Sequence, residues 1–545
     1  MFPASRRIPP LRLLGAFVFL LSLGPLTIQA QTYTDIHDFD CSVEGCQPQY
    51  PELLAQGRDG NLYGTTSAGG TVNMGTIFKV TPSGTVTTLY NFSGMDGQNP
   101  DAGLILGTDG NLYGTATRGG VNNDGTVFKI TPGGAFTKLH DFTASDAAPR
   151  GGVIEGKNGK FYGTTCSQFG PWTGYSITSS GTYKHLTNSV PPCPFSGLIL
   201  GADGKFYGTS QVGGDSSRGT VFSMTAAGAI KIIYSFDYTH GAYLYSPVAQ
   251  GNDGYLYGTT SGGGGPQDGV VFRLSTNGKK LTVLREFDAR QGTDGATPYA
   301  GLVAATDGNF YGATAGGANS GPVPGGDFFS INSTGSDYSM IFAFDDVHGA
   351  LAQATPMQHT NGKIYGLTGR GGPHAGEQGV IYEVDAGLPN FVYLMTRWGV
   401  SGKTVEILGT GLTGATSVKF GSGAATFNVV SDSYMTAVVP DSGSAGFVTV
   451  TMPSGTLTSS RTFFVTPVVS AISPASGPAG TKVTITGSGF TGATQVKLGS
   501  AKAAYTLNSG TSITATVPQG ASTGKFSVKT PGGNAASKTM FTVTP

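Results

Sequence analysis

The feature that most constrains the fold is a short motif that returns through most of the chain. Its first copy reads Asp-Gly-Asn-Leu-Tyr-Gly-Thr at 59–65, and every copy keeps an Asp-Gly or Asn-Gly pair followed, two residues later, by Tyr-Gly. A period near 50 residues with several short strands in each unit is typical of a β-propeller. The repeat therefore predicts a seven-bladed β-propeller over residues 31–385. Its motif tyrosines lie 45 to 54 residues apart: Tyr63, Tyr113, Tyr162, Tyr207, Tyr257, Tyr311 and Tyr365.

Each unit carries the signals of four short antiparallel strands. A short apolar run such as 103–106 comes first, and the Asp-Gly or Asn-Gly pair turns the chain back because Gly tolerates a positive φ. The Tyr-Gly segment is the second strand, a run such as 126–130 the third, and a run ending in an aromatic residue such as 139–142 the fourth. We expect the motif tyrosines to pack between blades, with an exposed ring for sugar stacking as the alternative.

The last unit has no fourth strand of its own. Its third-strand run lies at 379–384, whereas residues 34–40 near the start of the chain match the fourth-strand pattern of the other units. We therefore expect this N-terminal strand to close the propeller by completing its seventh blade. Such closure would join the ring by backbone hydrogen bonds and remove an open edge.

The N-terminus and the overall charge indicate export. Residues 1–30 read as a signal peptide, because arginines precede an apolar run at 13–21 that is too short to span a membrane. The 32 basic and 32 acidic residues give no net charge that would favour nucleic acid. We expect a monomer without cofactor, with no transmembrane segment after signal removal, that is secreted, periplasmic or held at the cell surface.

Four cysteines in an exported chain predict disulfides. In a propeller, the loop entering a blade and the loop joining its second and third strands emerge on the same face. Cys41 and Cys46 share one entering loop, Cys166 follows a second strand, and Cys193 lies on the next entering loop. We predict the pairs Cys41–Cys46 and Cys166–Cys193. A zinc site is the less favoured interpretation, because the chain has neither a Cys-x-x-Cys pair nor paired histidines.

From about residue 386 the Tyr-Gly units stop and a different repeat begins. Two segments resemble each other at a constant offset of 78 residues, which aligns Pro440 with Pro518 and Pro453 with Pro531. Each consists of short alternating strand signals, which suits a small immunoglobulin-like β-sandwich. The sequence thus predicts an all-β chain whose propeller is followed by two sandwiches, at 386–467 and 468–545.

Both repeats resemble known families. The stretch Ile-Ser-Pro-Ala-Ser-Gly-Pro-Ala-Gly-Thr that begins at residue 472 resembles the opening of an IPT/TIG domain, and the first copy departs from it at 395–399. The Asp-Gly-Asn-Leu-Tyr-Gly-Thr units resemble the GloVer tandem repeat, a family of exported bacterial proteins with varied C-terminal anchors. Neither family's motif names a catalytic residue, so the resemblance implies no catalytic site.

The residues nearest the predicted channel offer little chemistry. One residue stands three positions before each turn pair, and we interpret this set as channel lining. Only Glu155 supplies a carboxylate there, with His359 close by in the last unit. The alternative function, an extracellular polysaccharide lyase or hydrolase, would depend on these two residues. The full set is Gln56, Leu106, Glu155, Leu200, Gln250, Ala304 and Gln358.

The loops that enter the blades are the predicted binding surface. They vary in length and content, as in 93–102, 237–246 and 288–300, whereas the opposite face carries short Asp-Gly or Asn-Gly turns. Aromatic rings can stack on sugars and carboxylates can accept hydroxyl hydrogen bonds; solvated loops without a ligand are the alternative. We predict a non-enzymatic binding, adhesion or scaffold protein for an extracellular glycan or a cell-envelope protein. The candidate ligand-binding residues are Asp96, Asp101, Tyr238, Tyr243, Tyr245, Asp294 and Tyr299.

Overall fold

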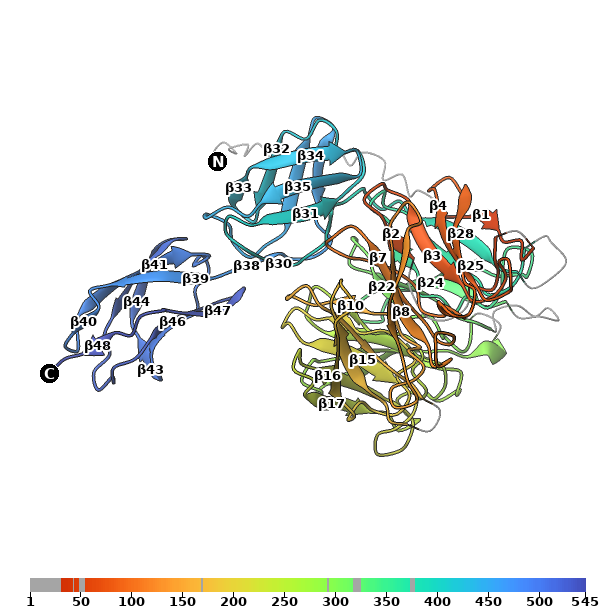
Figure 1. Cartoon of the computed structure of the whole chain (residues 1–545), viewed down its shortest axis with the longest axis horizontal. Coiled ribbons are helices and arrows are strands. Elements are labelled where there is room, and N and C mark those ends of the chain that lie inside the picture. Colours follow the sequence, from red (N-terminus) through yellow and green to blue (C-terminus); the bar gives the residue numbers. More distant parts are fainter. Residues whose placement is uncertain are drawn as a thin grey trace, which may run out of the picture.

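The computed structural model describes residues 31–42, 44–48, 54–167, 170–291, 294–316, 325–372 and 378–545 (Figure 1). These residues form an all-β structure, in which a 3-10 turn at Ala289–Gln291 is the one helical segment described. The signal peptide predicted at 1–30 lies outside the described residues.

Seven four-stranded antiparallel sheets follow the sequence repeats and together make the repeat domain. Sheet 1 contains β2 (Ala55–Gln56), β3 (Leu62–Thr66), β4 (Thr76–Val80) and β5 (Val86–Asn91). Sheet 2 contains β6 (Ile105–Leu106), β7 (Leu112–Ala116), β8 (Thr126–Ile130) and β9 (Phe136–Asp141). Sheet 3 contains β10 (Ile154–Glu155), β11 (Phe161–Thr164), β12 (Gly174–Ile177) and β13 (Tyr183–Thr187). Sheet 4 contains β14 (Ile199–Leu200), β15 (Phe206–Ser210), β16 (Thr220–Met224) and β17 (Ile230–Ser235).

The remaining sheets keep this order, from the shortest strand outward. Sheet 5 contains β18 (Ala249–Gln250), β19 (Leu256–Thr260), β20 (Val270–Leu274) and β21 (Leu281–Glu286). Sheet 6 contains β22 (Val303–Ala304), β23 (Phe310–Ala313), β24 (Asp327–Ile331) and β25 (Tyr338–Ala343). Sheet 7 contains β26 (Met357–Gln358), β27 (Ile364–Leu367), β28 (Val380–Asp385) and the N-terminal strand β1 (Thr32–Asp38). In sheet 7, β1 runs antiparallel to β28, from Thr32 opposite Asp385 to Asp38 opposite Val380.

The motif residues build the first hairpin of each sheet. Gly60 has a φ of 77°, which a residue with a side chain rarely adopts. Asp59 accepts a hydrogen bond from the Asn61 backbone N–H at 3.2 Å and another from the Tyr63 hydroxyl at 2.8 Å. The same tyrosine-to-aspartate bond recurs at Tyr113 and Asp109, at 2.7 Å. The hydroxyl thus has a partner at the turn while the ring is buried, and the predicted packing role of the tyrosines is confirmed.

Successive sheets are held together by shared apolar clusters. The ring of Tyr113 in sheet 2 stacks on Phe161 of sheet 3 at 3.8 Å between centroids, and Tyr257 of sheet 5 stacks on Phe310 of sheet 6 at 3.9 Å. A further cluster places Tyr365 of sheet 7 with Leu62 and Phe78 of sheet 1. The last sheet therefore packs against the first, so the apolar contacts run around the whole repeat domain.

In six of the seven sheets the aromatic residue expected at the end of the fourth strand lies one residue beyond it; in sheet 3, Asn188 follows β13 instead. Phe142 follows β9, its side chain is fully buried, and its backbone N–H donates to the Gly125 carbonyl at 2.9 Å. Phe39 follows β1 in the same way and is also fully buried. The chain leaves the ladder at this point because the ring turns into the cluster between two sheets.

Two β-sandwiches follow. The first contains β29 (Tyr393–Leu394), β30 (Trp398–Val400), β31 (Thr404–Leu408), β32 (Ser417–Phe420), β33 (Gly423–Ala425), β34 (Phe427–Ser431), β35 (Tyr434–Val438), β36 (Val448–Met452), β37 (Gly455–Thr458) and β38 (Phe464–Thr466). The second contains β39 (Val468–Ser473), β40 (Ser476–Gly477), β41 (Lys482–Ser488), β42 (Gln495–Leu498), β43 (Ala501–Ala503), β44 (Tyr505–Ser509), β45 (Ser512–Thr516), β46 (Phe526–Thr530), β47 (Gly533–Ala536) and β48 (Thr542–Val543).

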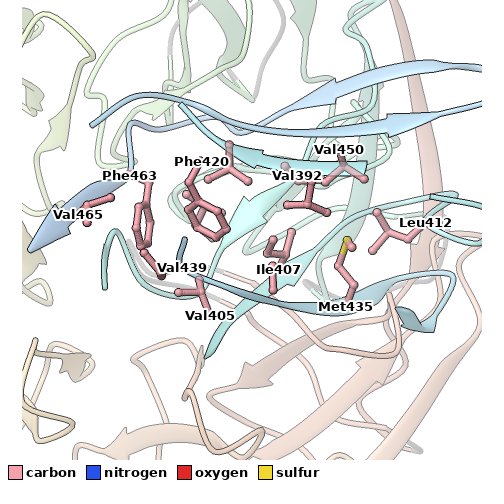
Figure 2. Close-up of a cluster of buried hydrophobic side chains, with 14 of the residues drawn as sticks. Val392, Val405, Ile407, Leu412, Phe420, Met435, Val439, Val450, Phe463 and Val465 are labelled. Carbon is pink, nitrogen blue, oxygen red and sulfur yellow. The ribbon is translucent and has the colours of Figure 1, made fainter. Parts of the chain in front are cut away.

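The two sandwiches share one topology. Each has two four-stranded sheets and one parallel strand pair, with Trp398 opposite Phe464 in the first and Ser476 opposite Thr542 in the second. The parallel pair forms in the first sandwich although its sequence departs there from the IPT/TIG opening. Figure 2 shows the core of the first sandwich, in which Phe420 and Phe463 meet edge to face at 4.8 Å.

Both predicted disulfides are present. Cys41 is bonded to Cys46 and Cys166 to Cys193. The second bond links the loop after β11 in sheet 3 to the loop that enters sheet 4. It therefore ties two neighbouring units together at the end where the long loops emerge.

Candidate functional site

The repeat domain has two different ends. The hairpin turns that join first to second strands and third to fourth strands emerge at one end, which we call the turn face. The loops that enter each sheet and the loops between second and third strands emerge at the other, which we call the loop face. Innermost strands of neighbouring sheets lie side by side, as β2 does with β6 and β10 with β14, so these strands surround the centre of the domain.

The first sandwich is bound to the turn face (Figure 1). The Arg58 guanidinium, beside the turn of sheet 1, pairs with Glu406 at 2.7 Å and lies 4.8 Å from the ring centroid of Tyr434. The Ser433 hydroxyl donates to the Arg58 carbonyl at 2.7 Å. The Arg58 side chain thus makes both an ionic and an aromatic contact with the sandwich.

Three other sheets reach the same sandwich. Thr360 of sheet 7 is hydrogen-bonded to Thr410 at 2.8 Å, and Lys157 of sheet 3 lies 3.8 Å from the ring centroid of Trp398. The Asn252 amide of sheet 5 donates to the Ser460 carbonyl at 3.4 Å. Contacts from sheets 1, 3, 5 and 7 place the sandwich across the middle of the turn face. The loop face is therefore the end that these contacts leave open.

The polar residues of the innermost strands bind neighbouring sheets to one another. Glu155 accepts hydrogen bonds from the backbone N–H and the hydroxyl of Thr108, at 2.8 and 2.7 Å. Gln358 accepts from the Thr306 N–H at 3.0 Å. Gln56 donates to the Thr360 hydroxyl at 2.8 Å, which joins sheet 1 to sheet 7. These residues do more than line a channel, because each fixes the turn of the preceding sheet.

Both residues of the enzymatic alternative are hydrogen-bonded within the fold. Burial raises the pKa of Glu155, an effect opposed by its two bonds from Thr108. His359 is buried, its Nδ1 accepts from the Asn361 N–H at 3.1 Å, and its Nε2 lies 3.0 Å from the Gly60 carbonyl, to which it donates. Burial lowers the pKa of His359, so the ring is neutral and both nitrogens are engaged. Both residues hold turns in place.

Of the seven predicted ligand-binding residues, four fasten their own loops. Asp96 accepts from the Ser93 N–H at 2.8 Å and the Tyr90 hydroxyl at 2.5 Å; burial alone would raise its pKa, but these bonds lower it. Asp294 is buried in an ion pair with Arg285 at 2.5 Å.

Tyr238 and Tyr243 form the other fastening. The Arg218 guanidinium carbon lies 4.9 Å from the ring centroid of Tyr238 and 5.5 Å from that of Tyr243, and the guanidinium also bonds the Tyr243 hydroxyl. Both rings are therefore already in contact with the Arg218 guanidinium.

The other three predicted residues share one repeat position. Asp101, Tyr245 and Tyr299 each stand four residues before the innermost strand of their sheet, and each is half-buried between two buried neighbours. The same position is held by Arg150 in sheet 3 and Phe195 in sheet 4. We call Asp101, Arg150, Phe195, Tyr245 and Tyr299 the loop-face arc. Gln353 is its counterpart in sheet 7, and the counterpart in sheet 1 lies outside the described residues.

Successive members of the arc are in contact. The Arg150 guanidinium lies over the Phe195 ring, 4.6 Å from its centroid. Phe195 and Tyr245 meet edge to face at 5.3 Å, and Tyr245 meets Tyr299 at 4.7 Å. Four consecutive sheets thus supply one continuous aromatic and cationic surface. Because the arc adjoins the innermost strands, it lies around the centre of the loop face.

One end of the arc is charged. Burial raises the pKa of Asp101 to about 6, and the nearby Thr117 hydroxyl and the positive charges of Arg150 and Arg118 partly oppose this shift. The buried Nε of Arg150 has no hydrogen-bond partner among the described residues. The arc therefore combines partly exposed ring surface with a cation whose Nε has no hydrogen-bond partner among the described residues.

The sequence interpretation missed Arg150 and Phe195. It selected loops by length and by their aromatic or acidic content, and the loops at 143–152 and 188–197 were not among those chosen. The signal that finds both residues is the fixed distance to the innermost strand. Counting four residues back from each short apolar run gives the whole arc.

A recess of about 280 Å³ opens on the turn face between sheets 4 and 5, beside Lys205, Tyr207 and Asn277. Lys205 there is paired with Asp203 at 2.9 Å. Within the described ranges no group of three or more His, Cys, Asp or Glu residues could hold a metal ion. No helix in that part of the chain is long and apolar enough to cross a membrane.

Several solved structures are similar to this chain at low sequence identity. A streptogramin B lyase is 15% identical, with a TM-score of 0.44, over 65% of this chain and 97% of that one. Virginiamycin B lyase from Staphylococcus aureus is 16% identical, with a TM-score of 0.43, over 65% and 98%. A surface glycan-binding protein from Prevotella bryantii is 20% identical, with a TM-score of 0.21, over 27% and 38%. No curated protein matches the sequence.

Family models match nearly all of the chain beyond its first residues. The Gloeobacter/Verrucomicrobia repeat matches residues 24–188 and 194–427, and the IPT/TIG domain matches 392–465 and 467–544. The first match covers the seven sheets with their Tyr-Gly hairpins, and the second covers the two sandwiches. The chain therefore belongs to the Gloeobacter/Verrucomicrobia repeat family and ends in two IPT/TIG domains.

Proposed function

We propose that this protein is an exported, non-enzymatic binding protein whose repeat domain presents the loop-face arc to an extracellular glycan. The observation that carries the proposal is the arc itself, in which residues from four successive sheets touch in series. A structural role alone would not require rings at this position, since Asp101 and Gln353 occupy it in other sheets.

The chemistry of the arc suits a sugar. The partly exposed rings of Tyr245 and Tyr299 offer apolar surface to the C–H groups of a pyranose. The Tyr245 hydroxyl accepts a hydrogen bond from the Gln211 amide at 2.5 Å, and it can still donate its own hydrogen to a sugar oxygen, as can that of Tyr299. A buried residue on either side holds each member in place. Binding groups fixed on a rigid framework lose little conformational entropy when the ligand arrives.

In this proposal the seven sheets are the blades of one propeller over residues 31–385, closed by β1. The sandwiches at 386–467 and 468–545 act as spacers or adhesion modules, the first of them also covering the turn face. Two disulfides support an oxidising compartment outside the cytoplasm, where such bonds persist. We expect a monomer that is secreted, periplasmic or at the cell surface.

A binding screen tests the proposal. The mature chain is applied to a glycan array and to insoluble polysaccharide and cell-envelope fractions. We expect retention on at least one glycan, and a loss of about tenfold or more in affinity for the paired change Tyr245→Ala and Tyr299→Ala, since each stacked ring contributes roughly 1 kcal/mol or more.

The matched control lies on the other face. Asn111→Ala and Lys205→Ala remove side chains that follow turn pairs of sheets 2 and 4, and they should leave retention unchanged. If no glycan is retained, or if only the turn-face changes weaken retention, the proposal is wrong.

A further inference from the structure

Arg150 is the cation of the arc, and it forms no ion pair with another described residue. The arginines that form ion pairs within the described residues are Arg58, Arg273, Arg285 and Arg290. The Arg150 guanidinium carbon instead lies over the Phe195 ring, 4.6 Å from its centroid. Its buried Nε has no hydrogen-bond partner in the described part of the chain. A partly buried cation in this condition calls for an anionic partner.

We propose that the loop-face arc selects a carboxylate-bearing sugar, so that the ligand is a glycan containing uronic acid. The carboxylate would bind the Arg150 guanidinium while the sugar ring lies against Tyr245 and Tyr299. This inference rests on the proposed function and names the class of glycan that the same site takes.

The geometry favours a carboxylate over a neutral group. The Arg150 guanidinium lies over the Phe195 ring, and no ion pair among the described residues uses its N–H groups. A planar fork of N–H donors matches the two oxygens of a carboxylate, and such paired bonds are shorter and stronger than neutral ones. The aromatic members begin directly beside this cation, with Phe195 touching Tyr245 and Tyr245 touching Tyr299. A sugar ring and its carboxylate can therefore be held at the same time.

The charges around the site give the expected pH dependence. Asp101 faces Arg150 and Arg118, and these are the charged groups that act on it. When Asp101 is ionised it competes with an incoming carboxylate for Arg150. Because its pKa is about 6, it becomes neutral as the pH falls through that value, while a sugar carboxylate with a pKa near 3.5 stays ionised. Binding of the acidic sugar should therefore tighten between pH 7.5 and pH 5.

The experiment compares acidic sugars with their neutral counterparts. Oligomers of galacturonate, glucuronate and mannuronate, each with its carboxyl-reduced form, are titrated calorimetrically into the mature chain. We expect at least one acidic oligomer to bind about tenfold or more tightly than its reduced form. Arg150→Met keeps an apolar stem over Phe195 and should abolish this difference, whereas Asp101→Asn should abolish the pH dependence.

A matched control is available on the same face. Arg218 also lies over aromatic rings, those of Tyr238 and Tyr243, but outside the arc. Arg218→Met should leave the acidic preference intact, and the melting temperature of each variant shows that it is folded.

The outcomes separate the two proposals. If acidic and reduced oligomers bind equally and both depend on Tyr245 and Tyr299, the site binds glycans but the preference for uronic acid is wrong. If Arg150→Met leaves the preference unchanged in a folded protein, the assignment of the carboxylate to Arg150 is wrong. If no acidic or neutral glycan binds at all, both proposals are overturned.

Discussion

Replacing Phe39 with alanine tests whether the N-terminal strand is an integral part of the repeat domain. Phe39 directly follows β1, is fully buried, and meets Phe78 of sheet 1 edge to face at 5.3 Å. It belongs to the cluster that joins sheet 7 to sheet 1, together with Leu62 and Tyr365. Loss of its ring should therefore open a cavity at the junction between the first and last sheets.

The expected cost is large. Truncating a buried phenylalanine to alanine costs about 3–5 kcal/mol, through lost burial and the cavity left behind. With an unfolding entropy of roughly 2.1 cal/mol/K per residue over about 350 residues, this lowers the Tm of the repeat domain by about 4–7 °C. Differential scanning calorimetry of the mature chain measures the shift.

Two variants calibrate the result. Phe142 is the fully buried counterpart of Phe39 in sheet 2, so Phe142→Ala should cost a similar amount. Thr34 lies on the exposed side of β1, and Thr34→Ala should change the Tm little. A Phe39→Ala variant that melts like the parent, beside a strongly destabilised Phe142→Ala, would show that β1 does not complete the domain.

Three further changes probe the sheet interfaces and the contact with the first sandwich. Asp327 is fully buried and burial raises its pKa to about 6, so its ionisation lowers stability as the pH rises from about 4 through 6. Asp327→Thr introduces the residue that Thr76 and Thr126 supply at this repeat position. Between pH 4 and pH 8 the unfolding free energy of this variant should therefore rise by up to about 3 kcal/mol relative to that of the parent. Urea unfolding measures it, and an equal difference between variant and parent at both pH values would contradict this. Glu155→Leu, which introduces the side chain that Leu106 and Leu200 have at this repeat position, leaves the Thr108 N–H without its acceptor and should cost about 1–3 kcal/mol while glycan binding is unchanged. Arg58→Ala removes the ion pair with Glu406 and the contact with Tyr434. This change should weaken the attachment of the first sandwich by about 1–2 kcal/mol and speed proteolysis at 386–391. Cleavage at the parental rate would argue against this attachment.

Much of the fold is readable from the sequence because its units repeat. The third strands expected at 126–130 and, in the last unit, at 379–384 coincide with β8 and, within one residue at each end, with β28. An Asp-Gly pair favours a tight turn, so it marks the first hairpin of each unit. A tyrosine that returns about every 50 residues has the same surroundings in each unit, so its position in one sheet predicts its position in the others. Both disulfides followed from the order of strands within a unit.

The candidate site was less predictable because the residues that contact one another there come from different repeat units. Asp294 and Tyr243 resemble binding residues in sequence, but Arg285 and Arg218 occupy them in the structure. Arg150 resembles an ordinary loop arginine until Phe195, on the next unit, is seen beneath it. These contacts join side chains 9 to 45 residues apart, and they depend on how neighbouring sheets pack rather than on a local sequence pattern.

The attachment of the first sandwich to four sheets has a mechanical consequence. The chain leaves the repeat domain at the end of β28, the strand that pairs with β1, so tension applied through the sandwiches would enter at that seam. Contacts from the sandwich to Arg58, Lys157, Asn252 and Thr360 instead spread such a load around the domain. A protein that binds a polymer under flow would thereby resist separation of β1 from β28, the pairing that joins the first and last strands of the repeat domain.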